Sequence, residues 1–260
     1  MHSSASFPLT AAPPTILGVI PARYASTRFP GKPLVDILGK SMIRRVYEQA
    51  MASKSLSKVI VATDDQRIFD HVKAFGGEVL MTKENHPSGT DRCQEVVLKN
   101  GKAFDYIINI QGDEPFIDPS QIDLLAGLLT DGKVELATLM IPVSSEELLF
   151  DKGEVKVVVN TKMEALYFSR MPIPFLKGHP ENEWHKNYTY FRHVGLYAYR
   201  RDVLQKITQL APSPLEKAES LEQLRWLENG FKISLAITSF DSHCIDSPED
   251  IARALLLLKK

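Results

Sequence analysis

Three cations stand close together directly after an apolar run. The stretch "IPARYASTRFPGKPL", residues 20–34, places Arg23, Arg28 and Lys32 among small residues, prolines and Gly31. Glycine and proline set an irregular path on which backbone amides approach an anion together with the cations. This charge fits a triphosphate, and its place after a strand favours phosphate binding over a solvated basic loop. The stretch has neither the "GxGxxG" pattern of dinucleotide-binding proteins nor the "GxxxxGK[ST]" pattern of P-loop proteins. Neither dinucleotide binding nor P-loop chemistry is therefore implied.

Carboxylates stand at the end of a second apolar run, "INIQGDEPFI", residues 108–117. Asp113 comes at the carboxyl end of this expected strand, where it would face the same crevice as the cations. A hard metal such as Mg²⁺ that bridges phosphates would be held at such a carboxylate. The alternative is that Asp113 and Glu114 cap the next helix. Asp118 and Ser120 are better caps by position, which leaves Asp113 for another role.

A further carboxylate lies far away in the chain, in "CIDSPEDIARAL", residues 244–255. Ser247 is the expected N-cap of a helix, with Pro248 at its first position and Asp250 at its third. Asp246 precedes the cap and could face a crevice. From its position alone, a ligand and a surface residue are equally good interpretations.

The remaining polar clusters are weaker signals. Ser88, Gly89 and Thr90 precede a helix, where they form either an ordinary cap or a contact to a base or sugar. A single histidine beside a strand, such as His193, is more often structural than functional. Polar residues on adjacent helical turns are usually solvated. The other residues of these clusters are Arg170 and Arg192 beside strands, and Glu219, Glu222 and Gln223 on an expected helix.

The elements that must position these residues follow a repeating pattern. Apolar runs rich in Val and Ile alternate with segments of helical period, which predicts an α/β fold with a mostly parallel, doubly wound sheet. In such sheets, ligands bind beyond the carboxyl ends of the strands. Strands are predicted at residues 16–22, 58–64, 77–82, 106–113 and 134–143, and helices at residues 41–53, 65–75, 90–98 and 120–129.

The rhythm changes after Ser144. Runs at residues 154–160, 165–170 and 192–199 look like strands separated by proline-marked loops, which predicts a smaller, mixed second lobe inserted at about residues 151–213. A helix at 214–228, a strand at 232–237 and a helix from about Pro248 complete the chain. We therefore predict a flexible extension at residues 1–15 and a single domain over residues 16–260.

Composition limits the classes of function. The chain has 260 residues and a formal net charge of −1, which gives no global reason to bind nucleic acid or an acidic membrane. Its two cysteines, Cys93 and Cys244, cannot form a disulfide framework, so we interpret both as packing residues in a reducing compartment. There is no signal-peptide pattern and no apolar run of membrane-spanning length. A cytoplasmic protein is predicted.

Taken together, the motifs resemble the CMP-Kdo synthetase family, the 3-deoxy-manno-octulosonate cytidylyltransferases of the lipopolysaccharide pathway. The resemblance extends over nearly everything after the N-terminal extension, with the motifs in the family order. Asp91 departs from it by standing where glutamate is common, and residues 175–190 are idiosyncratic. The matching motifs are "IPARYASTRFPGKPL", "VIVATDD", "SGTDRC", "INIQGDEPFI", "VKVVV", "ALYFSR", "HVGLYAY", "PSPLEKAESLEQLR" and "IDSPEDI".

The resemblance implies a fold of the nucleotide-diphospho-sugar transferase type and a role for each polar cluster. It implies that Arg23, Arg28 and Lys32 hold the triphosphate of CTP and that Asp113 and Asp246 bind Mg²⁺. The Ser88, Gly89 and Thr90 segment and the backbone near Ala22 would read cytosine. Arginine would suit an acid sugar because its planar fork matches a carboxylate. The implied Kdo-binding residues are Arg92, Gln111, Arg170, His193, Glu222 and Gln223.

The implied reaction is CTP plus Kdo giving CMP-Kdo and pyrophosphate, by in-line attack of the anomeric hydroxyl on the α-phosphorus. Arg23, Lys32, Asp113 and Asp246 would be the catalytic residues. The family also implies a homodimer. The alternatives are another acid-sugar nucleotidyltransferase, such as CMP-sialate synthetase, and a regulator that binds nucleotide sugars without catalysis.

Overall fold

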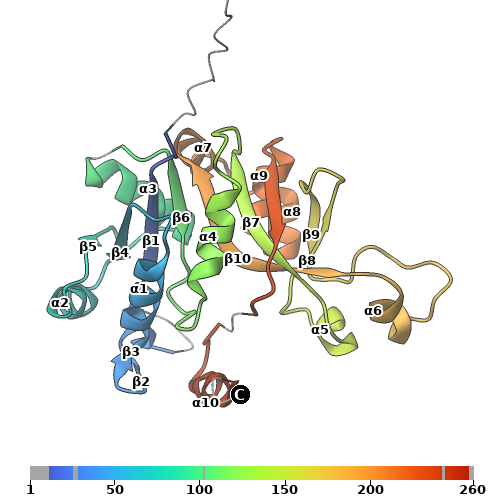
Figure 1. The fold of residues 1–260 in the computed structure, drawn as a ribbon, viewed down its shortest axis with the longest axis horizontal. Helices are drawn as coiled ribbons and strands as arrows, with labels where there is room; N and C mark the ends of the chain where they lie inside the picture. Colours follow the sequence, from blue (N-terminus) through green and yellow to red (C-terminus); the bar gives the residue numbers. More distant parts are fainter. Residues whose placement is uncertain (1–11, 26–28, 102, 242–243, 258–260) are drawn as a thin grey trace, which may run out of the picture.

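The computed structural model describes residues 12–25, 29–101, 103–241 and 244–257, with side chains omitted at 252–254 and 256–257. Most of the predicted extension, and Arg28 of the basic loop, lie outside these residues. The described chain forms a nine-stranded sheet with the order β11-β7-β10-β6-β1-β4-β5, to which β8 and β9 are attached through β10 (Figure 1). The strands are β1 Ile16–Ala22, β4 Lys58–Thr63, β5 Val79–Met81, β6 Tyr106–Asn109, β7 Leu136–Pro142, β8 Lys156–Val159, β9 Ala165–Ser169, β10 Phe191–Arg200 and β11 Ile233–Ile237. A two-stranded ribbon, β2 Asp36–Ile37 and β3 Lys40–Ser41, lies beside them.

Helices cover both faces of the sheet, because successive side chains of a strand point to opposite faces. On β1, Ile16 and Ile20 pack on one face and Leu17 and Val19 on the other. The first face is covered by α1 Met42–Ala52, α2 Gln66–Ala74 and α4 Pro119–Gly127. The second is covered by α3 Gly89–Asn100, α7 Arg201–Ile207 and α9 Glu222–Glu228. The predicted doubly wound sheet is confirmed.

Strand β10 links the central strands of the sheet to the hairpin of β8 and β9. Its residues Tyr197 to Arg200 pair antiparallel with β6, whereas Phe191 and Arg192 pair with β8. A bulge between Val194 and Tyr197 shifts its register on β7. Figure 1 shows β8, β9, α5 Glu146–Phe150 and α6 Trp184–Asn187 extending to one side. These hairpin strands belong to the main sheet, and the division of residues 151–213 into an inserted lobe stays a prediction.

Several predicted elements needed correction. The single helix predicted at residues 214–228 is wrong: α8 Pro214–Glu219 ends at Ser220, whose φ of 53° is left-handed, and α9 starts at Glu222. Tertiary contacts override helical propensity there, because the Glu219 carboxylate accepts from Ser169 and from the backbone of Arg170. The short helices α5, α6 and α7 and the 3₁₀ turns η1 Lys32–Leu34 and η2 Glu181–Glu183 had not been predicted.

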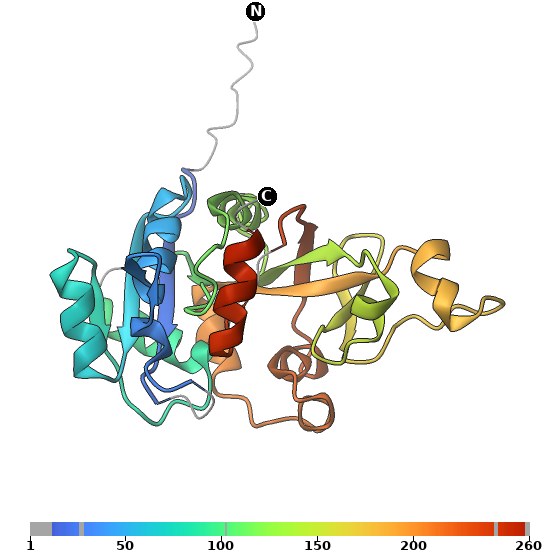
Figure 2. The ribbon, with the colours of Figure 1, turned by 90° about the horizontal axis from the view of Figure 1, so that it is seen from below.

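The final helix, α10 Pro248–Leu257, lies at the carboxyl-terminal edge of the central strands, as seen from the side and from below (Figures 1 and 2). Its approach is fixed by Ile245, which is buried beside Ile37 and Met42 and donates its N–H to the Asp113 carbonyl at 2.9 Å. Among the described residues there is no helix with the length and apolarity needed to cross a bilayer.

Candidate functional site

The basic loop after β1 and the acidic loop after β6 are held together by close backbone approach. A Cβ on Gly112 would lie 2.5 Å from the Pro21 carbonyl oxygen, so only glycine fits between the strand ends. Gly31 adopts φ 72° and donates its N–H to the Tyr24 carbonyl at 3.0 Å, which folds the basic loop back on itself. The Arg67 guanidinium lies 3.3 Å from the Tyr24 ring centroid and braces this loop. The sequence thus sets both loops beside one crevice.

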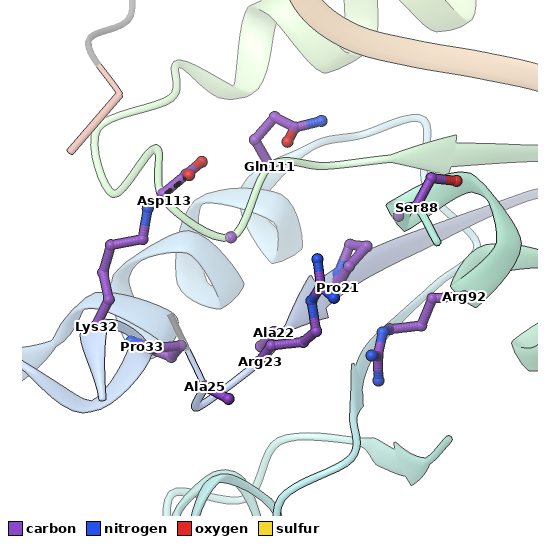
Figure 3. Close-up of a pocket in the computed structure, with 12 residues that line it drawn as sticks. Pro21, Ala22, Arg23, Ala25, Lys32, Pro33, Ser88, Arg92, Gln111 and Asp113 are labelled. Carbon is purple, nitrogen blue, oxygen red and sulfur yellow. Dashed lines mark hydrogen bonds and ion pairs between the residues drawn. The ribbon is translucent and has the colours of Figure 1, made fainter. Parts of the chain in front are cut away.

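A cavity of about 410 Å³ opens at this edge of the sheet (Figure 3). Figure 3 shows Lys32 extending toward Asp113 at one side, while Ser88 and Arg92 lie at the other. The Ser88 hydroxyl caps α3 by accepting from the Asp91 N–H, so the positive end of the helix dipole meets the cavity. The lining comprises Pro21, Ala22, Arg23, Ala25, Lys32, Pro33, Ser88, Gly89, Arg92, Gln111, Gly112 and Asp113.

Lys32 joins the two separated carboxylates. Its Nζ lies 2.8 Å from Asp113 Oδ2 and 3.2 Å from Asp246 Oδ1. Burial alone would lower the pKa of Lys32, but the charge and hydrogen bond of Asp113 raise it above the ordinary value. The Asp250 carboxylate accepts from the N–H groups of Asp246 and Ser247, as expected for a capping interaction. Two carboxylates from distant segments therefore face one point at the cavity rim.

The donor set at this point suits a divalent cation. Oxygen atoms of Asp113 and Asp246 and the Sγ of Cys244 all lie within 4.8 Å of one another. Carboxylate oxygens are the ligands that Mg²⁺ prefers. The interpretation of Cys244 as a packing residue is wrong, because its side chain is exposed, whereas Cys93 is buried as expected.

A smaller cavity of about 170 Å³ adjoins the first, since Gly89 and Gln111 line both. The Gln111 side chain is fixed by donating to the Gly195 carbonyl of the β10 bulge at 2.9 Å. Buried polar atoms of three lining residues have no hydrogen-bond partner in the described part of the chain: Asn109 Oδ1, Tyr197 OH and Trp226 Nε1. Buried polar groups usually have partners, so this cavity is suited to a small polar ligand. Its lining comprises Gly89, Thr90, Asn109, Gln111, Tyr197, Tyr199, Glu222, Gln223 and Trp226.

Glu222 reaches this smaller cavity from the start of α9. Its carboxylate accepts from the Ser88 and Thr90 hydroxyls, each at 3.1 Å. Burial nevertheless raises the pKa of Glu222 above its ordinary value. The break between α8 and α9 makes this placement possible, because it turns Glu222 and Gln223 toward the sheet rather than to solvent. The usual alternative, a solvated helix face, therefore does not apply to Glu222 and Gln223, which both line the cavity.

His193 lies beside the smaller cavity, although it is not among the residues that line it. Its ring centroid is 5.1 Å from that of Tyr197, and its Nε2 lies 2.9 Å from the Thr138 hydroxyl. The same hydroxyl is within hydrogen-bonding distance of the Val194 and Leu196 carbonyls in the β10 bulge. Burial, with a smaller contribution from Arg192, lowers the pKa of His193 to about 3. The imidazole is therefore neutral at neutral pH.

Two arginines expected near a sugar have other contacts in the structure. Arg92 is buried and donates to Asp64 at 2.8 Å and to Thr82, although it also lines the larger cavity. Arg170 lies outside the lining of both cavities. Its Nε donates to the Glu219 carbonyl at 2.8 Å and its NH1 to the Lys152 carbonyl at 3.0 Å. Arg170 thus fixes the junction that precedes α9.

Four residues that line the smaller cavity were not predicted from the sequence: Asn109, Tyr197, Tyr199 and Trp226. The signal for the two tyrosines was present in "HVGLYAY", where alternate positions share one face of a strand. Tyrosine in an apolar strand is typical of a core, and nothing in the sequence distinguishes the two environments.

The fold and the two cavities fit a nucleotidyltransferase, and comparison with known proteins shows that class. Residues 17–233 match the cytidylyltransferase family. The 3-deoxy-manno-octulosonate cytidylyltransferase of Cytophaga hutchinsonii is 56% identical over 92% of this chain and 96% of its own, and that of Parabacteroides distasonis is 54% identical over 93% and 97%. This chain belongs to the 3-deoxy-manno-octulosonate cytidylyltransferase family.

Solved structures agree with this assignment. The structure of CMP:2-keto-3-deoxy-manno-octonic acid synthetase complexed with CTP is 44% identical in sequence and has a TM-score of 0.87. The match covers 95% of this chain and 100% of that chain. The 4-diphosphocytidyl-2C-methyl-D-erythritol synthase of Anaerococcus prevotii is only 12% identical, with a TM-score of 0.62 over 95% of this chain and 97% of its own. That second likeness shows a shared fold alone.

Proposed function

We propose that this protein transfers CMP from CTP to the anomeric hydroxyl of 3-deoxy-D-manno-octulosonate, Kdo, and releases pyrophosphate. The observation that carries the proposal is the pair of adjoining cavities that share Gln111 and Gly89. The larger one combines cations, a helix N-terminus and a carboxylate, and the smaller one is lined by polar groups that need partners. The first suits a nucleoside triphosphate and the second a hydroxyl-rich sugar.

On the nucleotide side, Arg23 and Lys32 would neutralise the charge that accumulates on the leaving pyrophosphate. Arg28, assigned to the same role, lies outside the described residues. The Ser88 to Thr90 segment, with the backbone at Ala22, would bind the cytosine. Backbone and helix-terminal groups are suited to this task because they are held rigidly before the substrate arrives.

Asp113 and Asp246 would hold Mg²⁺ at the cavity rim. When bound, Mg²⁺ would supply positive charge that offsets the phosphates and activates the attacking hydroxyl. The two aspartates must first exchange their contact with Lys32, whose ammonium would then turn to the triphosphate. Cation binding and phosphate binding are thereby linked through one side chain.

On the sugar side, Gln111, Glu222, Gln223 and Tyr197 would bind the hydroxyl groups of Kdo. Neutral His193 would orient the sugar through its neighbour Tyr197. Arg92 and Arg170 were assigned to the sugar by resemblance; we propose that Arg170 acts by positioning the start of α9. In this arrangement the anomeric oxygen forms a bond to the α-phosphorus as the bond from that phosphorus to the pyrophosphate oxygen breaks, and the hydroxyl proton leaves to solvent.

A homodimer, a cytoplasmic location and a place in lipopolysaccharide synthesis are further proposals, supported by the family resemblance. The two-cysteine composition also favours a reducing compartment.

The deciding experiment measures pyrophosphate release from CTP and Mg²⁺ with Kdo, with N-acetylneuraminate, or with no sugar. We expect release only with Kdo. Equal release with N-acetylneuraminate would indicate an acid-sugar transferase of another specificity. Absence of release under all three conditions, in protein shown to be folded, would favour the regulator and contradict the proposal.

A further inference from the structure

A thiol stands beside the carboxylates at the rim of the larger cavity. The Sγ of Cys244 and carboxylate oxygens of Asp113 and Asp246 lie within 4.8 Å of one another. Neither the need for Mg²⁺ nor the chemistry of phosphoryl transfer explains this thiol, because Mg²⁺ is a hard cation that selects oxygen ligands. Cys244 is not part of the hydrophobic core, so packing does not explain it either. Partial burial and the neighbouring Asp113 and Asp246 carboxylates raise the pKa of its thiol, so the proton is held until a cation displaces it.

The backbone of this segment accounts for the position of the thiol. Ile245 is fully buried and its N–H donates to the Asp113 carbonyl at 2.9 Å. Cys244 and Asp246 flank Ile245 and both come within reach of Asp113, on the side away from the core that Ile245 enters. The thiol is therefore held at the site by the same anchor that positions Asp246.

The three groups form a mixed donor set of one sulfur and two carboxylates. Thiolate is a soft ligand that favours Zn²⁺ and related cations, whereas carboxylates also accept Mg²⁺. We propose that Cys244 is a third protein ligand at this site, through which a thiophilic divalent cation such as Zn²⁺ binds in place of Mg²⁺ and without nucleotide. The identification of the two carboxylates as the Mg²⁺ site rests on the proposed function; the thiophilic site itself rests on the geometry.

Binding by this set requires two exchanges. The cation displaces the Lys32 ammonium, which lies 2.8 Å from Asp113 and 3.2 Å from Asp246. The thiol releases its proton to solvent as the metal–sulfur bond forms, because only the thiolate is a ligand. A cation held in this way occupies the position assigned to Mg²⁺ and blocks it, so Zn²⁺ acts as a competitive inhibitor with respect to Mg²⁺.

The test uses Co²⁺ as a spectroscopic probe of Zn²⁺ sites, in full-length protein without CTP or Kdo. We expect a thiolate-to-Co²⁺ charge-transfer band in the near ultraviolet, removed by added Zn²⁺ and absent from Cys244→Ser. The substitution should weaken Zn²⁺ binding by at least about tenfold more than Mg²⁺ binding, since loss of even an outer-shell partner costs about 10–100-fold. Serine keeps an oxygen, which Mg²⁺ tolerates and Zn²⁺ bonds less well.

A second measurement needs no substitution. Because burial and the neighbouring carboxylates raise the pKa of the Cys244 thiol, iodoacetamide should alkylate it slowly, and the measurement is made at alkaline pH. Zn²⁺ should slow that alkylation further, while buried Cys93 serves as the internal control that stays unmodified. In Asp246→Asn, the protection by Zn²⁺ should fall. The proposal is overturned if Co²⁺ gives no thiolate band, if the band persists in Cys244→Ser, or if Zn²⁺ does not protect the thiol. A thiolate band in a protein that releases no pyrophosphate would support this site and contradict the proposed function.

Discussion

Lys32 and Asp113 form an ion pair in which Nζ lies 2.8 Å from Oδ2. The pair joins the basic loop after β1 to the acidic loop after β6, and Asp246 extends it to the segment before α10. A side-chain cation thus stands between the two carboxylates assigned to the metal. Any divalent cation that binds there competes with Lys32, and this competition determines how the site responds to substitution.

Replacing Lys32 by methionine should have opposite effects on the two ligands. Without CTP, the affinity for Mn²⁺ should rise about fivefold, because an ion pair worth about 1 kcal/mol no longer opposes the metal. The KM for CTP should rise at least about tenfold, since a charged hydrogen bond to phosphate is lost. Electron paramagnetic resonance titration measures the Mn²⁺ affinity, and steady-state kinetics measure the KM for CTP.

Lys40→Met, which removes an ion pair with Glu48 away from the site, is the matched control. A KM increase confined to Kdo would contradict the assignment.

Asp113→Asn and Asp246→Asn should each lower kcat at least about a hundredfold while the protein stays folded, because each removes a charged oxygen from the cation site. Circular dichroism and pyrophosphate release test this. Asp118→Asn is the control, since Asp118 caps α4 and asparagine caps helices equally well. Near-normal turnover in Asp246→Asn would remove that residue from the site.

We expect Tyr197→Phe to weaken Kdo binding without loss of stability, and Tyr199→Phe to lower the free energy of unfolding. The Tyr197 hydroxyl is buried without a partner in the described residues, so its loss should not lower the free energy of unfolding, yet the KM for Kdo should rise about tenfold. The Tyr199 hydroxyl contacts Thr90 and Asn109, at 3.3 Å and 3.4 Å, and its loss should cost about 1 kcal/mol of stability. Urea unfolding and Kdo kinetics distinguish the two variants. Unchanged Kdo kinetics in Tyr197→Phe would exclude its hydroxyl from sugar binding.

His193→Gln should alter the response of stability to acid. The pKa of His193 is about 3 in the folded protein and about 6.5 when unfolded, so between these values the unfolded chain binds the extra proton. Wild-type stability is therefore highest above pH 6.5 with respect to this group, and falls by up to about 1.4 kcal/mol per unit as the pH drops toward 3. Glutamine does not titrate, so urea unfolding between pH 7 and pH 5 should show a shallower fall in the variant. Parallel curves would mean that the imidazole is not held neutral. CTP affinity, measured by calorimetry, should not change.

The doubly wound sheet could be predicted from the sequence because apolar strands and amphipathic helices are each recognised from short stretches of the chain. The alternation of apolar runs and helical segments predicted this sheet. The position of Asp113 directly after a buried strand predicted that its carboxylate faces the crevice at the carboxyl ends of the strands. The contact between Lys32 and both carboxylates could not be predicted, because it depends on the packing of Ile245 against residues some two hundred positions earlier in the chain.

Other errors came from residue types with more than one common environment. Free cysteine is usually buried, so Cys244 was interpreted as packing, and only its anchored neighbour places it at the cavity rim. The stretch "PLEKAESLEQLRWLE" contains no residue that breaks a helix in its interior, and only contacts from Ser169 and Arg170 to Glu219 account for the end of α8. That break is what brings Glu222 to the smaller cavity.

Gln111 stands at the boundary of the two cavities, fixed to the β10 bulge through the Gly195 carbonyl. The groups on one side of it come from the loops after β1 and β6 and from the start of α3, whereas β10 and α9 contribute most of the other side. The acceptor side could therefore be changed by substitutions in α9 and in the half of β10 that carries Tyr197 and Tyr199. The half that we assign to the nucleotide would stay unchanged, so new acceptors could be selected against one fixed donor.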